Sequence, residues 1–403
     1  TYWDTEAYCL PFYLKTADPK VARQLLVYRY HHLDRAIENA EKLGFKDGAA
    51  LYPMVTMNGE ECHNEWEITF EEIHRNGAIA FGIYNYVRHT GDHAYLDTYG
   101  LPVLAGIARF WAQRFNWSEA KQAYVMLGVT GPNEYENNVN NNWYTNYIAR
   151  WCISYCLEVN AKVKADLPQK LSAQEIDKFQ HIAANVYFPT LEGTSIFLQQ
   201  DGFMDKEQLS ASDIPVAERP INQHWSWDRI LRSVFIKQAD VLQGIYLFED
   251  RFSEEEIREN FNFYEPKTVH ESSLSPCVHV VIAAAIGRMD KAYELYLRTS
   301  RLDLDDYNHE ADEGLHITSM AGTWLSLVEG LAGVRIGEDG LTINPSIPEA
   351  WKQYHFQILY KNQPLRIEVN QHGGTIENLG SSEVSLRLKN QAHAVLSMEK
   401  ITF

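Results

Sequence analysis

The sequence predicts a mainly α-helical protein, a toroid of paired helices followed by a small C-terminal antiparallel β-sheet domain. From about residue 17 to residue 335, apolar residues recur every three to four positions, the spacing of one helix face. The loops between these helices are rich in Trp, Asn, His and acidic residues, and strands do not alternate with helices. After Gly340 the apolar spacing becomes two, as in a β-strand. We therefore expect a functional site in the loops at one end of the toroid.

The predicted helices follow one another along most of the chain. The first has apolar residues at Leu25, Leu26, Leu33 and Ile37 and ends near Gly44. Further helices are expected near residues 65–89, 93–115, 143–165, 173–186, 227–248, 254–262, 277–299 and 317–333. Ser253 and Glu256 have the spacing of a capping box at the start of one of them.

The C-terminal part reads as a β module. Residues 356–360 and 365–369 alternate between apolar and polar, and a Lys-Asn-Gln-Pro turn joins them, which predicts a hairpin. Another alternating run covers residues 384–388. The predicted domains are therefore a helical domain over residues 1–336 and a β-sheet domain over residues 337–403.

The composition narrows the class of protein. At 403 residues the chain exceeds the usual size of a single core, and 45% of its residues are hydrophobic. A net charge of −18 without a basic stripe argues against nucleic acid as a partner. No apolar run is long enough to span a membrane. These features fit an enzyme that acts on a neutral substrate.

The cysteines give no sign of a disulfide framework or a metal site. They are odd in number and scattered, at Cys9, Cys62, Cys152, Cys156 and Cys277. We expect buried free thiols in a cytoplasmic protein, with no metal and no cofactor. The chain opens at Thr1 inside a dense motif, so we expect it to be a segment of a longer protein.

The loop over residues 125–150 is the strongest candidate for chemistry. An apolar run leads to a Gly131-Pro132 turn, a single acid at Glu134, five asparagines between residues 137 and 142, and Trp143. One acid among aromatic and amide side chains suits a site that holds a sugar and protonates its glycosidic oxygen. The alternative, a solvated Asn-rich turn that caps the next helix, is equally compatible with the loop alone.

Three further segments carry candidate sugar-binding residues. Trp3 and Asp4 place a carboxylate beside an aromatic face, as in a sugar clamp, although a helix cap explains the pair as well. Glu60 and Glu61 lie in a glycine-led loop and are either binding residues or surface charge. Lys237 and Gln238 are able to donate to sugar hydroxyls, and the alternative is a solvated helix face. His74, nearby, reads as a structural histidine.

Two segments predict a binding site for an inorganic anion. The run His-Glu-Ser-Ser-Leu-Ser, with Ser272 and Ser273, precedes a helix and offers hydroxyl and backbone donors. His316 lies in a second Gly- and Thr-rich loop that opens another helix. Neither phosphate-loop nor dinucleotide glycine fingerprints are present, which argues against a nucleotide. The alternative is two well-capped helices.

These motifs together resemble a known family. The runs WDTEAYCLPFYL, TGPNEYENNVNNNWYTN, IKQADV, HESSLS and HITSMAGTW are similar, in the same order, to the inverting disaccharide phosphorylases of glycoside hydrolase family 65. The resemblance covers nearly all of the chain. The Asn-Glu-Tyr-Glu-Asn-Asn sequence of the acid loop is most similar to that of the family members that cleave maltose.

The resemblance implies an (α/α)6 toroid barrel followed by a C-terminal β-sheet domain, with the family's N-terminal β-sandwich and helical linker expected before Thr1. It also implies that Glu134 is the general acid. Trp3, Asp4, Lys237 and Gln238 match the substrate-binding residues, and Glu60 and Glu61 are assigned less securely to the sugar. Ser272, Ser273 and His316 match the phosphate-binding segments.

The implied reaction is the reversible, inverting phosphorolysis of maltose by inorganic phosphate, giving β-glucose 1-phosphate and glucose. The alternatives are a phosphorylase of another glucose disaccharide (kojibiose, trehalose or nigerose), an inverting α-glucosidase that uses water, and an inactive carbohydrate-binding protein. A base for water activation would have to come from Glu271 or Asp312, close to the anion-binding loops. The resemblance also implies a homodimer.

Overall fold

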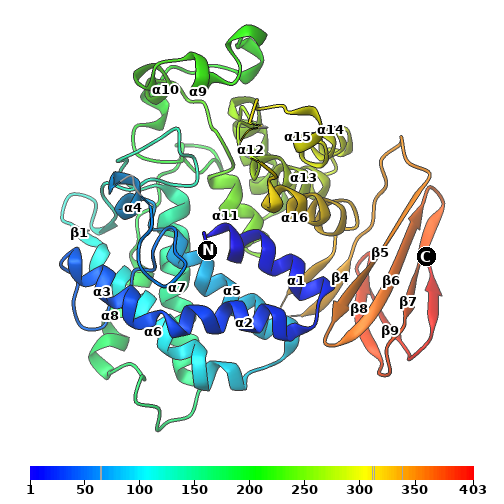
Figure 1. The fold of residues 1–403 in the computed structure, drawn as a ribbon, viewed down its shortest axis with the longest axis horizontal. Helices are drawn as coiled ribbons and strands as arrows, with labels where there is room; N and C mark the ends of the chain where they lie inside the picture. The colour runs from blue at the N-terminus through cyan, green and yellow to red at the C-terminus, as the bar shows by residue number, and fades with distance from the viewer. Residues whose placement is uncertain (64–65, 311, 313, 338) are drawn as a thin grey trace.

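The computed structural model describes residues 1–63, 66–310, 312, 314–337 and 339–403. It shows a helical body with β-sheets at one side, and the first residues lie near the middle of the helical body (Figure 1). The C-terminus lies in the sheets, far from the polar loops (Figure 1). The predicted order, helices first and strands last, is confirmed.

Among the described residues, six helical elements form a closed ring in which each packs against the next and the last against the first. The ring consists of η1 (Thr5–Cys9) continuing into α1 (Leu10–Thr16), α5 (Arg75–Thr90), α7 (Trp143–Lys162), α11 (Val241–Leu247), α13 (Ser275–Ala285), and α16 (Ile317–Leu325) continuing into η9 (Ser326–Leu331). These helices are apolar around most of their circumference, as a helix covered on all sides must be. In α13, for example, every residue from Ser275 to Ala283 is buried.

A second layer of helices packs outside this ring. It contains α2 (Pro19–His31) with α3 (Leu33–Lys42), α6 (Leu101–Arg114), α8 (Ala173–Ala184), α12 (Glu254–Tyr264) and α14 (Met289–Ser300). The predicted capping box of Ser253 and Glu256 is present at the start of α12. The pairing of inner and outer helices is that of an (α/α)6 barrel, so the predicted fold class is confirmed.

The polar loops at one end carry short helices and one small hairpin. These are α4 (Trp66–Glu71), α9 (Ile221–His224), α10 (Trp227–Arg232), α15 (Leu302–Asp305), and the strands β1 (Asn116–Ser118) and β2 (Ala123–Val125). Figure 1 shows α9 and α10 standing out from the upper end of the helical body. No helix in the described part of the chain is both long enough and apolar enough to cross a membrane.

Four predicted helices are interrupted, so their predicted continuity was wrong. The first predicted helix, which was expected to end near Gly44, divides at His32 into α2 and α3. The segment expected over residues 65–89 divides into α4 and α5 at residues 72–74. The segment over 227–248 divides into α10 and α11, with extended chain between them. The segment over 277–299 divides at Gly287, whose φ of 75° ends α13 before α14 begins. Across the break at Gly287 the apolar spacing continues because the residues on both sides, in α13 and α14, are buried in the same core.

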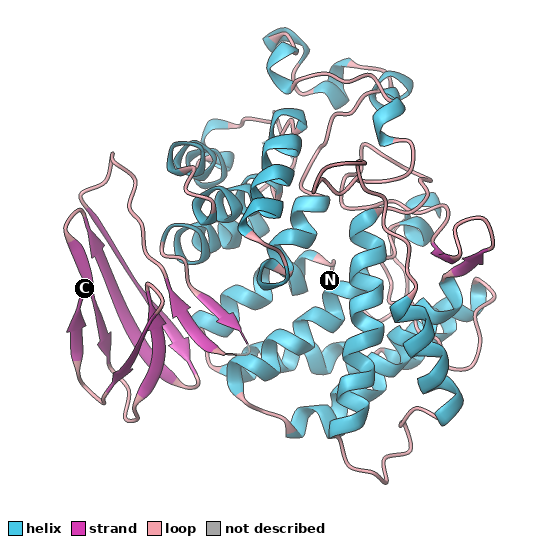
Figure 2. Cartoon of the chain, turned by 180° about the vertical axis from the view of Figure 1, so that it is seen from behind, coloured by secondary structure: helices cyan, strands magenta, loops and turns pink. Residues whose placement is uncertain are grey.

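The C-terminal strands form two four-stranded sheets, seen at the side of the helical body in Figure 2. One sheet has the order β10-β7-β6-β5 and the other β3-β4-β8-β9. The strands are β3 (Arg335–Gly337), β4 (Gly340–Ile343), β5 (Gln353–Tyr360), β6 (Gln363–Asn370), β7 (Gly373–Asn378), β8 (Val384–Leu388), β9 (Gln391–Val395) and β10 (Lys400–Thr402). The predicted hairpin is β5–β6, whose turn residues Lys361 and Asn362 both have positive φ. One pair, β4 with β8, is parallel, which corrects the expectation of a purely antiparallel domain.

The five cysteines form no disulfide, as expected. Cys152, Cys156 and Cys277 are buried, whereas Cys62 is exposed and Cys9 is half-buried. The expectation of buried thiols therefore holds for the three cysteines that lie on the ring helices α7 and α13 and not for the other two.

Candidate active site

The loop that carries Glu134 is held in place by buried polar contacts. Asn142 caps α7 by accepting a hydrogen bond from the Thr145 amide at 2.8 Å, and its side-chain NH2 donates to Asp240 at 2.9 Å. Gly131 passes so close that an added Cβ would lie 2.2 Å from an Asp240 oxygen, which explains why this turn needs glycine. Burial raises the pKa of Asp240 to about 7 despite these hydrogen bonds.

The asparagines of this loop bond to the protein itself. Asn141 accepts from the Met126 amide at 3.0 Å, and Asn138 donates to the Glu71 carboxylate from its backbone at 2.9 Å and its side chain at 3.1 Å. Asn133 accepts from the Lys237 amide at 2.9 Å. Of the five asparagines between residues 137 and 142, whose amides were expected to hold a sugar, Asn138, Asn141 and Asn142 bond to protein groups in this structure. Their hydrogen bonds hold the loop so that Glu134 projects from it.

Glu134 lies at the rim of the site with 22% of its side chain exposed. The Lys237 ammonium contacts its carboxylate, although the two residues are 103 positions apart. Burial alone would lower the pKa of Lys237, but the charge of Glu134 and the hydrogen bond to it outweigh burial and raise this pKa. The structure thus brings together the predicted acid and one predicted substrate-binding residue.

Trp3 and Asp4, the predicted sugar-binding pair, lie close to Glu72 and Glu134. The Trp3 ring is buried, with its edge against the His74 ring at a centroid distance of 5.0 Å. Burial, together with the negative charges of Glu72 and Glu134, raises the pKa of Asp4 to about 7. Asp4 therefore belongs to the same charged cluster as Glu134.

Gln238 links the acid loop to the serine loop, which we define as residues 270–275. Its side-chain NH2 donates to the Pro132 carbonyl at 2.7 Å, and its side-chain oxygen accepts from the Ser272 hydroxyl. The Ser272 oxygen also accepts from the Leu274 amide at 3.3 Å. Ser273 is half-buried, and its hydroxyl has no hydrogen bond to any residue that the structure describes. The serine loop thus stands directly behind the acid.

Glu271 is occupied by the protein. Its two carboxylate oxygens accept from the Tyr135 hydroxyl at 2.5 Å and from the Ile221 amide at 2.8 Å, and the residue is 4% exposed. A general base needs a free oxygen within reach of a water molecule. The Glu271 side chain therefore connects the acid loop to the serine loop through its hydrogen bonds. Asp312, the other possible base, is exposed.

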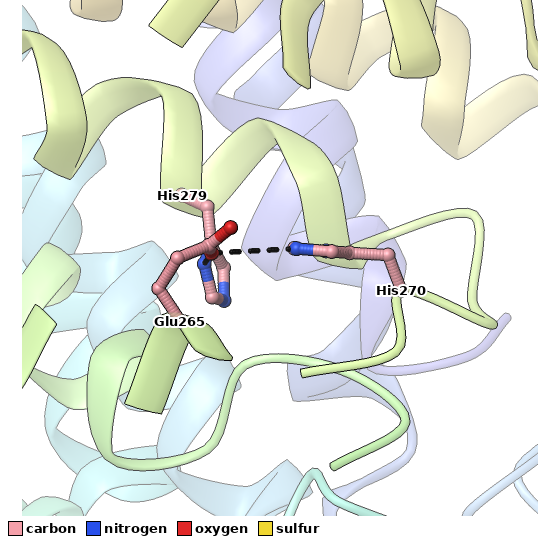
Figure 3. Close-up of side chains that lie close together, drawn as sticks. All are labelled: Glu265, His270 and His279. Atoms are coloured by element: carbon pink, nitrogen blue, oxygen red, sulfur yellow. Dashed lines mark hydrogen bonds and ion pairs between the residues drawn. The ribbon is translucent and has the colours of Figure 1, made fainter. Parts of the chain in front are cut away.

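Behind the serine loop, Glu265, His270 and His279 converge, as Figure 3 shows. Their ligand atoms lie within 4.8 Å of one another. One Glu265 oxygen is only 2.6 Å from His279 Nδ1, which is a hydrogen-bond distance shorter than the separation of two ligands around zinc, about 3.3 Å for bonds of about 2.0 Å. The Lys291 ammonium lies 3.4 Å from the other oxygen of Glu265. This arrangement is that of a hydrogen-bonded network.

That network holds the start of the serine loop. His270 adopts a left-handed backbone with φ of 54°, and its Nδ1 is 2.8 Å from the Ser275 hydroxyl at the start of α13. Burial opposes ionisation of Glu265, but hydrogen bonds from His270 and His279 outweigh it and hold the pKa of Glu265 below its usual range. Burial lowers the pKa of His270 to about 4, so this histidine is neutral at physiological pH.

The other predicted residues lie farther from the acid. His316 Nδ1 is 2.7 Å from Asp303, and its Nε2 faces Glu310 at 3.6 Å. Glu61 accepts the backbone amides of its own loop, from Met54 at 2.6 Å and Val55 at 3.0 Å. Glu60 is exposed and lies 4.0 Å from Arg35. Within the described residues no contact joins any of these three to Glu134 or to Ser272.

The sequence analysis did not identify Glu72. This carboxylate is completely buried beside His74, and its charge acts on both Asp4 and Glu134. In the sequence, the run Glu-Glu-Ile-His reads as part of a continuous amphipathic helix, so no local signal distinguishes Glu72 from an acid on the solvent face of that helix. The break between α4 and α5 is what turns it inward.

A ring of six inner helices with polar loops at one end places the chain among the (α/α)6-barrel proteins. Residues 1–325 match the family model described as glycosyl hydrolase family 65 central catalytic domain. Residues 334–395 match the model described as glycosyl hydrolase family 65, C-terminal domain. The chain belongs to glycoside hydrolase family 65.

Its relatives are disaccharide phosphorylases. It is 56% identical over 372 residues to the maltose phosphorylase of Bacillus subtilis, an alignment that covers 92% of this chain and 49% of that protein. It is 35% identical to an α,α-trehalose phosphorylase of Geobacillus stearothermophilus, over 100% of this chain and 54% of that one. A solved structure, a putative kojibiose phosphorylase from the human microbiome, superposes with a TM-score of 0.94 at 33% identity, covering 100% of this chain and 54% of that chain. The chain therefore spans about half the length of the curated relatives it matches.

Proposed function

We propose that the protein catalyses the reversible, inverting phosphorolysis of maltose to β-glucose 1-phosphate and glucose. The observation that carries the proposal is the placement of Glu134, a partly exposed acid between the Trp3-Asp4 pair and the serine loop. The relative named maltose phosphorylase, at 56% identity, supports the choice of disaccharide.

In this mechanism Glu134 donates its proton to the glycosidic oxygen as the bond from the anomeric carbon to that oxygen breaks. An oxygen of inorganic phosphate attacks the same carbon from the opposite face, so the configuration inverts. A donor must carry a proton, so the Lys237 ammonium, which contacts the Glu134 carboxylate here, must turn to the substrate or the phosphate in the productive complex. Lys237 then adds positive charge where the phosphate arrives.

The state of Glu271 supports phosphate over water as the nucleophile. Hydrolysis with inversion needs a free carboxylate about 6.5–9.5 Å from the acid to deprotonate water. Both oxygens of Glu271 are bound within the protein. Phosphate needs no base, only donors, and the Ser273 hydroxyl and the start of α13 are suited to provide them.

The remaining site assignments are part of the same proposal. Trp3 and Asp4 hold the glucosyl unit, and Ser272, Ser273 and His316 hold phosphate. For His316 this requires that Glu310 leave its Nε2. Gln238, Glu60 and Glu61 contact other protein groups in this structure. To contact substrate, each of them has to give up those protein contacts. We assign the chemistry to residues 1–336 and propose that a homodimer in the cytoplasm is the working form.

The experiment is to incubate the protein with maltose, with and without phosphate, and to follow the products by proton NMR. We expect β-glucose 1-phosphate only when phosphate is present. Glucose released at the same rate without phosphate would instead identify an inverting glucosidase. A parallel panel of kojibiose, trehalose and nigerose tests the linkage, and binding of maltose without turnover at any phosphate concentration would indicate a binding protein.

A further inference from the structure

The wall of the site beside Trp3 contains buried polar atoms that lack hydrogen-bond partners. Among the described residues they include Trp3 Nε1, Asp4 Oδ1, both carboxylate oxygens of Glu72 and both ring nitrogens of His74. Buried polar groups in proteins nearly always find partners, because the water they lose must be replaced. Four neighbouring residues that all break this rule indicate a place where the partners come from a ligand.

Glu72 is the most unusual of the four. It is 0% exposed, and the nearest polar neighbour of its carboxylate, His74 Nε2 at 3.3 Å, lies outside hydrogen-bonding geometry. The same side of the site holds the Trp3 ring, whose edge packs on His74. The negative charge of Glu72 acts on Tyr2, Asp4 and Lys237, which surround Glu134.

We propose that Glu72 is a further sugar-binding residue, whose carboxyl group joins that of Asp4 in hydrogen-bonding the hydroxyls of the glucosyl unit on Trp3. This inference rests on the proposed function. A pyranose presents adjacent hydroxyl groups, and a carboxyl group with two free oxygens is able to bind two of them. Glu72 has both oxygens free.

Two other roles fit the contacts less well. A general base must be ionised to take up a proton, whereas burial and the charge of Glu134 raise the pKa of Glu72. A structural residue would have partners, as the adjacent Glu71 does: its two oxygens accept from Thr130 at 2.9 Å and from Asn138. Glu71 holds the acid loop, and Glu72, next to it in the chain, holds nothing in the protein.

The surroundings also explain how an unpaired carboxyl group is tolerated. Burial and the charge of Glu134 raise the pKa of Glu72 well above its usual range, against the opposing charges of Arg75, Lys237 and His63. A raised pKa favours the neutral form of the carboxyl group, which both donates and accepts. Burial also lowers the pKa of His74 to about 3, so no positive charge on that ring opposes this state.

The test compares stability with function in the full-length protein. Glu72→Met removes the carboxyl group and Glu72→Gln retains part of its hydrogen bonding. The matched control is Glu329→Gln, which alters a buried carboxylate bound to Lys15 and Tyr246 away from the site. We expect the melting temperature of Glu72→Met, without ligand, to equal or exceed that of the wild type, while that of Glu329→Gln falls. A fall for Glu72→Met as large as for the control would show a structural role and overturn the proposal.

The functional readout is kcat/KM in the synthetic direction, with β-glucose 1-phosphate and its 2-, 3-, 4- and 6-deoxy analogues. We expect a loss of about 10- to 100-fold for Glu72→Met, a smaller loss for Glu72→Gln, and none for Glu329→Gln. One or two of the analogues lack a hydroxyl group that Glu72 is proposed to bind. With those analogues the wild type should already show the reduced kcat/KM, and Glu72→Met should reduce it no further. Losses that add for every analogue would overturn the inference. Inactivity of the wild type with every analogue and with the parent would instead reject the proposed function.

Discussion

The two ends of the first inner helix differ in whether their buried polar groups have hydrogen-bond partners. At its start, Asp4 and its neighbour Glu72 have carboxylate oxygens without hydrogen-bond partners in the described structure. At its end, the Lys15 ammonium is 2.6 Å from Glu329, whose other oxygen accepts from the Tyr246 hydroxyl at 2.7 Å. Both ends are buried in the same core.

The paired end connects parts of the fold. Arg335, on β3, bonds to Glu249 at 2.7 Å and to the Glu329 carbonyl, so the ring helices and the first strand of the sheets are joined there. A cavity of about 680 Å³ lies at this end, lined by Lys15, Glu329 and Arg335 among others. Lys15 pairs with Glu329 and Arg335 pairs with Glu249, which distinguishes this end from the end that carries Glu134.

The difference teaches that burial alone does not mark a functional site. Burial by itself would raise the pKa of Glu329, as it does that of Asp4. The charges of Lys15 and Arg335 outweigh burial, so the pKa of Glu329 is lower than its usual value. Burial raises the pKa of Asp4 to about 7, and its neighbours Glu72 and Glu134, which are also acids, add to this shift. A buried charged group that has a partner holds the fold together, whereas one without a partner indicates a place where a ligand binds.

The largest effect should come from Glu134→Gln. We expect kcat for phosphorolysis to fall about 10²- to 10⁴-fold, because the leaving oxygen no longer receives a proton, while the melting temperature stays within a few degrees of the wild type. The control is Glu136→Gln in the same loop, whose carboxylate pairs with Lys206 at 2.8 Å. Full activity of Glu134→Gln would remove it from the acid role.

Lys15→Met should have the next largest effect, and on stability instead of catalysis. It leaves Glu329 as a buried charge that has lost its ammonium partner, and we expect the free energy of unfolding to fall by about 3–5 kcal/mol. The folded fraction should keep a normal kcat/KM. Denaturant unfolding measures the first quantity, and the double variant with Glu329→Met should recover part of the loss. A variant as stable as the wild type would contradict the contrast between the two ends.

Tyr135→Phe should have a moderate effect at the catalytic end. It removes the hydroxyl that donates to Glu271, and we expect a loss of about 1–3 kcal/mol in stability together with a larger rise in KM for phosphate than for maltose. Tyr264→Phe is the matched control, since it removes a buried hydroxyl bonded to the Phe197 carbonyl. Equal changes in both Michaelis constants would show that Glu271 does not connect the acid loop to the serine loop.

The smallest effect concerns pH. Between about pH 4 and pH 7, Asp4 is protonated in the folded state and ionised in the unfolded state, so folding takes up a proton. Its contribution to the free energy of unfolding therefore falls as pH rises, by at most about 1.4 kcal/mol per pH unit. Glu329, whose folded pKa is lowered, contributes stability that is lost as pH falls. Asp4→Asn should flatten the downward slope in ligand-free protein, and an unchanged slope in pH-dependent unfolding would refute this assignment.

Much of the fold and part of the site were predictable because their signals are local. The helix face of Leu26 and Ala36, the capping box at Ser253 and the hairpin turn at Lys361 each depend on residues within a few positions of one another. Glu134 was singled out in the same way, as one acid after a Gly-Pro turn, and its role as the general acid stays a prediction. The parallel pairing of β4 with β8 was not, since forty residues of chain, 344–383, separate the two strands.

By itself the sequence determined the order of helices and strands, the turns and the motifs, because these depend on the spacing of side chains along one stretch of chain. The tertiary structure alone decided which polar groups find partners. The contact of Lys237 with Glu134, the use of Gln238 as a link, and the inward turn of Glu72 all join segments that are distant in sequence or depend on a helix break. The free energy of a buried charge depends on its neighbours in space, and local periodicity carries no information about them.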